Sequence, residues 1–483
     1  MDVLVVTLRR NWIKRNKGVL YTYDGDSDDD YEAFVEKMNP PRVVVDNESC
    51  PNATVIEVGS KANKNGILLE VVQVLTDLNL VVTKGYITQD GGWFMDVFSV
   101  TDKDGNKLKD QTTIEKVEGH IRKSLGVDSS YAPSKRRSVD VATSTDYTVI
   151  ELTGNDRPGL LSEVSAVLYD LNCNLVKVEI WTHNTRAAAI LHLTDQSTNS
   201  PVKDSDRLSM IKERLNYVLK GSNLSRGAKT DVSVGCAKNM ERRLHKLMSD
   251  DGDFEIDSQD VAGGKTKRPS VKITNWNDKD YSVVTIRCKD RPKLLFDAVC
   301  TLTDMMYVIF HGNVAVEGSE AYQEFYIRHV DGSRVKDEDR ERVIHWLKAA
   351  IERRVYEGLK LELSTPDIVG LLSEVTRIFR EHSLTVTRAE ISSGEGKAIS
   401  TFYVRDNNGD IVMQKTIETI REKLDQIVKQ KTIETIREKL DQSVLHVEGQ
   451  IEQTSKCTKR SPINFLFGEL FRAMSLNFGR PSL

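Results

Sequence analysis

The sequence lacks the features that identify several large classes of protein. No apolar run in its 483 residues approaches the roughly 20 residues that a membrane-spanning helix requires. Lys and Arg total 68 against 72 Asp and Glu, with no large block of one sign, so nothing points to nucleic acid or an anionic membrane as partner. The six cysteines are scattered without metal-ligand spacing, and we interpret them as reduced and structural. We therefore expect no metal, no cofactor, no nucleic acid and no membrane.

The motifs of common catalytic and cation-binding sites are also missing. No His is followed by Asp, and neither a P-loop nor a GxSxG motif is present. The Gly-Ser turn at Gly221 lacks the carboxylate pair that a nucleotidyltransferase needs. The acidic run from Asp24 to Asp30 has Asp29 where an EF-hand loop needs glycine, and Val35 where it needs Glu. We expect no catalytic residue and no enzymatic activity.

The N-terminal segment does not have the pattern of a secretory signal, because its basic residues follow its short apolar stretch. Between Asp2 and Asp24 it carries five Arg or Lys and no acid, which keeps a plastid presequence as an alternative. Short basic clusters begin at Lys135 and Lys265, where they are solvated linker charge or nuclear-import signals. We expect a cytoplasmic or nuclear location.

What the sequence contains is one pattern repeated four times. Each copy begins with a strand of β-branched or alternating residues, followed by a polar turn and a helix with apolar residues at three- and four-residue spacing. Two strand-like runs and a second amphipathic helix follow. This order, with a closing strand, is that of the ferredoxin-like plait, and we predict an α+β protein of four tandem βαββαβ modules. The expected division is an acidic lead-in with an extension at 1–42, modules at 43–128, 145–235, 279–358 and 359–448, and an aromatic tail at 449–483.

The first helices of the four copies share two residue types in register. The residue that opens the helix and the acid four positions later are Gly66 and Glu70, Gly159 and Glu163, Lys293 and Asp297, and Gly370 and Glu374. Because the plait leaves one sheet face and the sheet edges free, we expect tandem copies to pair. The strand at 359–363 either ends module 3 or begins module 4.

The run from Asn155 to Val164, NDRPGLLSEV, resembles the signature of ACT domains. Four such copies, with the lead-in YDGDSDDDYEAFVEKMNPPRVVVDN and the aromatic tail, resemble the plant ACT domain repeat family, which is similar to the sensor region of bacterial uridylyltransferases. The resemblance implies a regulatory protein that binds free amino acids. As partners it suggests a second copy of the chain or another ACT-containing protein.

The start of the first helix can form such a site. Free N–H groups and a partial positive charge suit a carboxylate, glycine permits close approach, and a nearby carboxylate can accept an ammonium group. Asp156 and Asp367 would contact the ammonium group. The alternative for Asp156 is a helix cap alone, which is the commoner use of such a residue. We prefer modules 2 and 4, because Lys293 blocks module 3 and Asn63 removes the charge from module 1. The candidate ligand-binding residues are Asp156, Arg157, Gly159, Leu160, Asp367, Gly370, Leu371 and Gly66.

Two other functions compete with amino-acid sensing. One is an interaction scaffold whose modules bind other ACT proteins without a ligand. The other is a nucleotidyltransferase, for which the sequence lacks the motifs.

An exact duplication stands near the C-terminus, where residues 414–426 recur at 430–442. Sixteen residues rotate a helix by about 160° beyond whole turns, so the two copies cannot both pack on one sheet without a break. We predict that one copy forms the last helix of module 4 and that the other is an insertion. The segment from Val3 to Val19 is interpreted as a similar addition.

Overall fold

The computed structural model describes residues 42–60, 66–90, 93–125, 147–220, 227–235, 239–255, 268–276, 279–355, 358–394, 396–408 and 412–448. The acidic run at 24–30, the segment 3–19, the basic cluster at 135–137 and the aromatic tail at 449–483 lie outside these ranges. The described residues form two compact units, 1–137 with 261–351 and 138–260 with 352–483. We call them unit 1 and unit 2. Within the described ranges, no helix has the length and apolarity needed to span a bilayer.

Unit 1 contains modules 1 and 3, which share one eight-stranded sheet of order β1-β2-β4-β3-β11-β12-β10-β9. The elements of module 1 are β1 (Arg42–Asp46), β2 (Thr54–Ser60), α3 (Ile67–Asp77), β3 (Val81–Asp90), β4 (Trp93–Thr101) and α4 (Gln111–Ser124). Those of module 3 are β9 (Ser270–Asn275), β10 (Ser282–Lys289), α8 (Leu294–Asp304), β11 (Tyr307–Glu317), β12 (Glu320–His329) and α9 (Arg340–Glu352).

Unit 2 contains modules 2 and 4, which share a seven-stranded sheet of order β13-β15-β14-β6-β7-β5-β8. The elements of module 2 are β5 (Tyr147–Asn155), α5 (Leu160–Asp170), β6 (Cys173–His183), β7 (Arg186–Asp195), α6 (Ser205–Lys220) and β8 (Lys229–Gly235), followed by α7 (Met240–Asp250). Those of module 4 are β13 (Leu359–Pro366), α10 (Leu371–Glu381), β14 (Leu384–Gly394), β15 (Lys397–Asp406) and α11 (Gln414–Glu448). Strand β13 pairs with β15, so the strand at 359–363 begins module 4.

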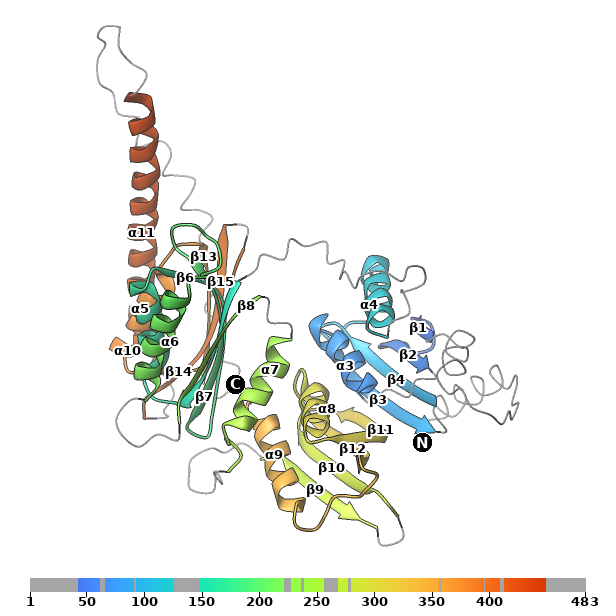
Figure 1. Cartoon of the computed structure of the whole chain (residues 1–483). Coiled ribbons are helices and arrows are strands. Elements are labelled where there is room, and N and C mark those ends of the chain that lie inside the picture. The colour runs from blue at the N-terminus through green and yellow to red at the C-terminus, as the bar shows by residue number, and fades with distance from the viewer. Residues whose placement is uncertain are drawn as a thin grey trace, which may run out of the picture. The chain divides into compact units, whose positions relative to one another are not determined.

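Modules pair edge to edge, and the pairs are alternate copies rather than neighbours in sequence. Strand β3 of module 1 runs antiparallel to β11 of module 3, and β6 of module 2 runs antiparallel to β14 of module 4. Close approach at the first seam favours glycine, because a Cβ on Gly312 would stand 3.0 Å from the Ile87 side chain, which would have to shift. The pairing also lays the first helices of partner modules against each other, α3 with α8 and α5 with α10. Figure 1 shows α5, α6 and α10 together on one face of the unit 2 sheet.

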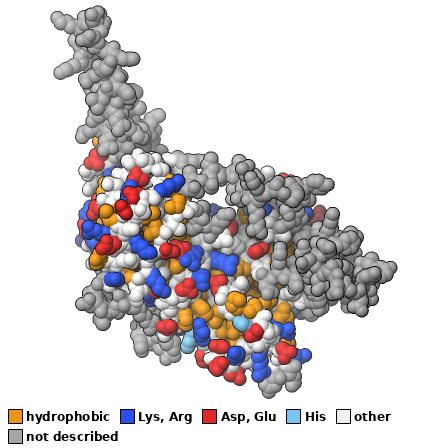
Figure 2. Space-filling view, viewed as in Figure 1, with side chains coloured by type: hydrophobic (Ala, Val, Ile, Leu, Met, Phe, Trp, Pro, Cys, Tyr) orange, Lys and Arg blue, Asp and Glu red, His pale blue; other side chains and the backbone are white. Residues whose placement is uncertain are grey.

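Apolar spacing explains why these helices lie on the sheets. In α10 the buried residues recur at helical intervals, at Leu371, Val375, Ile378 and Phe379, and they join the same core as the strands beneath. Each such side chain contributes about 1.5–3 kcal/mol on burial. The outer face is polar: Figure 2 shows Lys and Arg interspersed with Asp and Glu over unit 2. The ferredoxin-like modules predicted from the repeat are confirmed.

Two details differ from the expected topology. In modules 1 and 3 the edge strand comes before the module's first core strand: β1 pairs with β2, and β9 pairs with β10. Among the residues described, a closing strand after the second helix is found only in module 2, where β8 pairs with β5. The stretch from 249 onward is also more than a linker. Helix α7 packs on the sheet face opposite α5 and α6, through Leu244 and Met248 against Trp181.

A buried charge network holds the turn after α7. The Arg353 guanidinium donates to both Asp253 carboxylate oxygens at 2.6 Å, and both side chains are fully buried. His183 lies 2.9 Å from the same carboxylate. Burial would raise the pKa of Asp253, but Arg353 and His183 outweigh it and lower that pKa to about 2. The sequence did not predict this interaction, because the stretch is polar and an Asp residue in a polar stretch is normally exposed.

The duplicated segment forms one continuous helix, α11. In the first copy Ile420 and Leu424 are 1% and 2% exposed and belong to the core of unit 2, whereas Ile433 in the second copy is 40% exposed. The first copy is therefore the packed one, as the rotation argument requires. No break is needed, because the helix simply continues past the sheet. The side chain of Ile436 lies outside the described part.

Replacing Arg353 by Met should lower the free energy of unfolding by about 3–5 kcal/mol, because it removes the guanidinium that neutralises the buried Asp253 carboxylate and leaves that carboxylate with the His183 imidazole. The matched control is Arg377→Met, which removes an exposed pair with Glu374 and should cost less than about 1 kcal/mol. Urea denaturation measures both. Equal losses would contradict the account of the network.

The two copies in α11 should respond differently to truncation. Ile420→Ala removes a buried side chain and should cost about 2–5 kcal/mol, whereas Ile433→Ala should stay within about 0.5 kcal/mol. Thermal unfolding of the two variants compares them. A larger loss for Ile433→Ala would show that the wrong copy was assigned to the core.

Candidate functional site

All four first helices begin directly after a residue in the left-handed backbone region. The four aligned positions have φ of 101° at Gly66, 82° at Gly159, 67° at Lys293 and 74° at Gly370, and each is the N-cap without a side-chain cap. Glycine adopts this conformation freely, whereas a residue with a Cβ loses roughly 1–2 kcal/mol. The alignment therefore identified a backbone requirement shared by the modules.

Asp156 does not cap α5, so the capping interpretation is wrong. The helix begins at Leu160, three residues after the position that a cap at Asp156 would require. Instead, the amide of Asp156 donates to the Thr185 carbonyl at 2.8 Å, and that of Asp367 donates to Gly396 at 3.0 Å. These bonds tie each turn before the helix to the β-hairpin of its own module.

The amides of the predicted residues Leu160 and Leu371 are not free. They donate to the carbonyls of Arg157 and Ile368, each at 3.1 Å. The next two amides of a helix are the ones for which the helix itself supplies no acceptor. In α10 these belong to Leu372 and Ser373, and both residues line the same cavity as Gly370 and Asp367.

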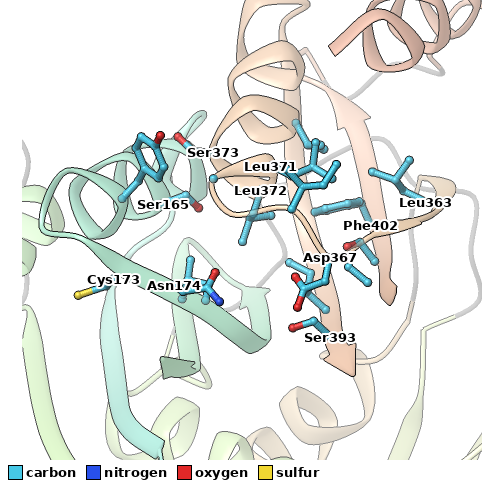
Figure 3. Close-up of a pocket in the computed structure, with 18 residues that line it drawn as sticks. Ser165, Cys173, Asn174, Leu363, Asp367, Leu371, Leu372, Ser373, Ser393 and Phe402 are labelled. Carbon is cyan, nitrogen blue, oxygen red and sulfur yellow. The ribbon is translucent and has the colours of Figure 1, made fainter. Parts of the chain in front are cut away.

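This cavity, of about 50 Å³, lies where modules 2 and 4 meet in unit 2. Module 4 contributes the turn at Asp367, the start of α10, and Ser393, while module 2 contributes Asn174 and Tyr169. Figure 3 shows Asp367 beside Ser393, with Asn174 facing them from the other module. Partial burial raises the pKa of Asp367, and the Ser393 hydroxyl opposes that rise. A carboxylate, an amide and helix N–H groups thus converge on one small space.

The equivalent place at α5 is nearly closed. Asp156, Gly159 and Leu160 line a space of only about 10 Å³, with Phe379 and Val386 from module 4. Burial raises the pKa of Asp156 to about 6, against the attraction of Arg405. Asp156 therefore already has a cationic neighbour, whereas no charge interaction accompanies the shift at Asp367.

Arg157 is held in a structural clamp. Its guanidinium donates to Glu163 at 2.7 Å and to the Val218 carbonyl at 2.9 Å, which joins α5 to α6. In module 3, Arg291 makes the same contacts with Asp297 and with the Ile351 carbonyl. The acid that recurs four positions after the helix opening is explained in these two modules by the clamp.

The glycines of unit 2 face side chains of the neighbouring module, a role that the sequence did not suggest. A Cβ on Gly370 would stand 2.4 Å from the Tyr169 ring, and one on Gly159 would stand 2.8 Å from the Arg380 side chain. Tyr169 and Arg380 are both the tenth residue of a first helix, α5 and α10. Lys431 of α11 lies 5.8 Å from the Tyr169 ring. Tyr169 and Arg380 could have been predicted to face these glycines only if the pairing of modules 2 and 4 had been known.

Gly66 differs from both, because a Cβ there would meet nothing within 4 Å. It lines a cavity of about 210 Å³ in unit 1, formed by modules 1 and 3. Module 1, which the sequence ranked below modules 2 and 4, thus has the roomiest helix start of the three glycine-containing modules. In module 3, which has no glycine at this position, Lys293 is the left-handed residue before the helix.

Among the residues described, no group of three or more His, Cys, Asp or Glu side chains could hold a metal ion. Backbone amides of the first helical turn and single carboxylates border these small cavities. Such groups can hold a zwitterion at both ends.

Comparison with known proteins agrees with the repeat. Residues 49–130 match the profile of the ACR family N-terminal ACT domain, and residues 148–205 and 360–425 match that of the ACT domain. The chain is 56% identical to ACT domain-containing protein ACR4 of Arabidopsis thaliana, over 95% of this chain and 98% of that protein. It is 52% identical to ACR5 of the same plant, over 95% and 99% of the two chains. With ACR3 it shares 48% identity, over 82% and 88%. The predicted resemblance is confirmed, and the chain belongs to the ACR family of ACT domain-containing proteins.

Proposed function

We propose that this protein is a non-catalytic sensor that binds a free amino acid at the start of α10, where modules 2 and 4 meet. One observation carries the proposal: the carboxylate of Asp367 and the first-turn residues Leu372 and Ser373 border the same cavity. The α-carboxylate would accept hydrogen bonds from the helix amides, and the ammonium group would pair with Asp367. The small size of the cavity favours small amino acids.

A ligand at this place would act on both modules at once. It would touch α10 of module 4 and also Asn174 and Tyr169 of module 2, so it would favour one arrangement of the two modules over others. A regulatory signal of this kind needs only a difference in affinity between two arrangements.

The alternative is a scaffold that binds other ACT proteins without a ligand. It is favoured by strand β13, which lies at the end of the unit 2 sheet with β15 as its partner. Within the described residues no closing strand covers β13 as β8 covers β5. An uncovered edge strand can pair with a strand of another chain.

Asp367→Asn should weaken binding of the cognate amino acid by about 10- to 100-fold, the worth of one hydrogen bond to a charged group. The full-length protein is titrated calorimetrically with each standard amino acid, followed by the variant. Asp290→Asn is the control, because Asp290 holds the equivalent turn in module 3. Silence with every amino acid would reject the sensor function and leave the scaffold.

Tyr169→Thr should widen the same cavity, because the Tyr169 ring covers Gly370. We expect larger amino acids to gain at least about tenfold in affinity relative to wild type. Tyr217→Thr, on the exposed face of α6, should change nothing. An unchanged selectivity in Tyr169→Thr would mean that this ring does not limit the site.

A further inference from the structure

A second cavity, in unit 1, has a different chemical character. It is lined by the start of α3, by β3 and β4 of module 1, and by the segment 303–309 with Val330 of module 3. Its volume is about 210 Å³, against about 50 Å³ at Asp367. Met306 and Val330, which line it, are 54% and 44% exposed, so the cavity has apolar residues where it meets solvent.

The two cavities differ in the side chain that faces the helix opening from the partner module. The tenth residue of α8 is Thr303, in the place that Tyr169 occupies in α5. Thr303 lines the cavity without filling the space at Gly66, whereas Tyr169 covers Gly370. The side chain that faces the helix opening is thus small at the larger cavity and large at the smaller one.

Asp96 lies in the wall of the unit 1 cavity and is 2% exposed. The strand register identifies the equivalent position in the other modules, which lies two residues before a buried Phe or Leu of the same strand. The four equivalent residues are Asp96, Ala189, Gln323 and Ser400. Asp96 is the ionisable member of the set. In the module 4 cavity the same place is taken by the neutral Ser400.

Nothing cationic lines the cavity with Asp96. Among its described lining residues Tyr307 is the other titratable group, and burial raises the pKa of its phenol, so it is neutral at pH 7. Charged residues of the surrounding elements, such as Glu70 of α3, Lys84 of β3 and Glu57 of β2, do not line it. Burial raises the pKa of Asp96 to about 8, against a hydrogen bond from the Thr88 amide. A buried carboxyl of this kind gains from a cation brought by a ligand.

We propose that the unit 1 cavity binds a small molecule with a protonated group at the end of a carbon chain, such as a side-chain amine, which pairs with Asp96. Where the ligand also has a carboxylate, the first-turn amides of Leu68 and Leu69 receive it. The apolar walls at Ile87 and Phe94 hold the carbon chain between the two ends. The proposal rests on the small-molecule sensing function proposed above, but it concerns a different cavity and a different ligand class.

The pairing has a consequence for protons. In the empty cavity the Asp96 carboxyl is largely protonated at pH 7, because its pKa is about 8. A bound ammonium group favours the carboxylate, so binding releases close to one proton. Affinity therefore rises as pH increases from 6 to 8 and levels off above that range, until the ligand amine itself loses its proton.

The test uses calorimetry on the full-length protein in two buffers of different ionisation enthalpy. The probes are lysine, arginine, ornithine and 1,5-diaminopentane, with norleucine as the match of lysine that lacks the side-chain ammonium group. We expect at least one amine to bind at least about tenfold more tightly than norleucine with release of a proton. Comparing lysine with 1,5-diaminopentane shows whether the carboxylate contributes.

Three variants assign the signal to its cavity. Asp96→Asn keeps the shape and should lose at least tenfold in affinity together with the proton release. Thr303→Tyr copies the residue that covers Gly370 and should abolish binding, with an intact thermal transition as proof of folding. Tyr217→Thr, on the exposed face of α6, should leave amine binding unchanged.

Two results would overturn the proposal. In the first, no amine binds the wild type; in the second, amines bind equally to wild type, Asp96→Asn and Thr303→Tyr, which would mean that the buried acid is only structural. Either result leaves the amino-acid site of unit 2 standing, provided that an amino acid binds there and Asp367→Asn weakens it. Loss of that dependence alone would reject the unit 2 site and not this one.

Discussion

The antiparallel pairing of β3 with β11 and of β6 with β14 is the constraint on which the sites depend. It joins alternate modules into one sheet and brings the start of each first helix against the end of its partner's first helix. A helix start alone is only a set of free amides. The partner module decides what faces them, through Tyr169 in unit 2 and Thr303 in unit 1.

The four modules share one backbone conformation at the start of the first helix, but the side chains around that start differ. The left-handed residue before the helix is retained in all four modules, even where it is Lys293. Around it the tenth residue of the partner helix differs, Tyr169 in unit 2 and Thr303 in unit 1, and so does the strand position held by Ser400 or Asp96. The small cavity therefore has its acid in the turn before the helix, at Asp367, and the larger one has its acid in the strand wall, at Asp96.

Much of the fold could be predicted from the sequence because it depends on local periodicity. The helix opening at Gly66, Gly159, Lys293 and Gly370 was found by alignment, and each proved to be the N-cap. The pairing of alternate modules was not predictable, since every module offers a similar edge. The burial of Asp253 against Arg353 was missed for a related reason: its partner is 100 residues away.

The site was only partly foreseen. Gly370 and Asp367 do line one cavity, but Arg157 is occupied by Glu163, and the free amides belong to the residues after Leu160 and Leu371. Asp96 was not predicted as a site residue, because a single acid in a strand has no sequence pattern that marks it. Its position in the cavity wall depends on the strand register, which the sequence alone does not give.

Hydrogen–deuterium exchange of the full-length protein, with and without saturating amino acids and amines, tests most directly whether helix starts at module junctions bind small molecules. The account predicts slower exchange at the amides of Leu372 and Ser373 with an amino acid, and at those of Leu68 and Leu69 with an amine. Unchanged exchange at both helix starts, in the presence of a ligand that binds measurably, would contradict it.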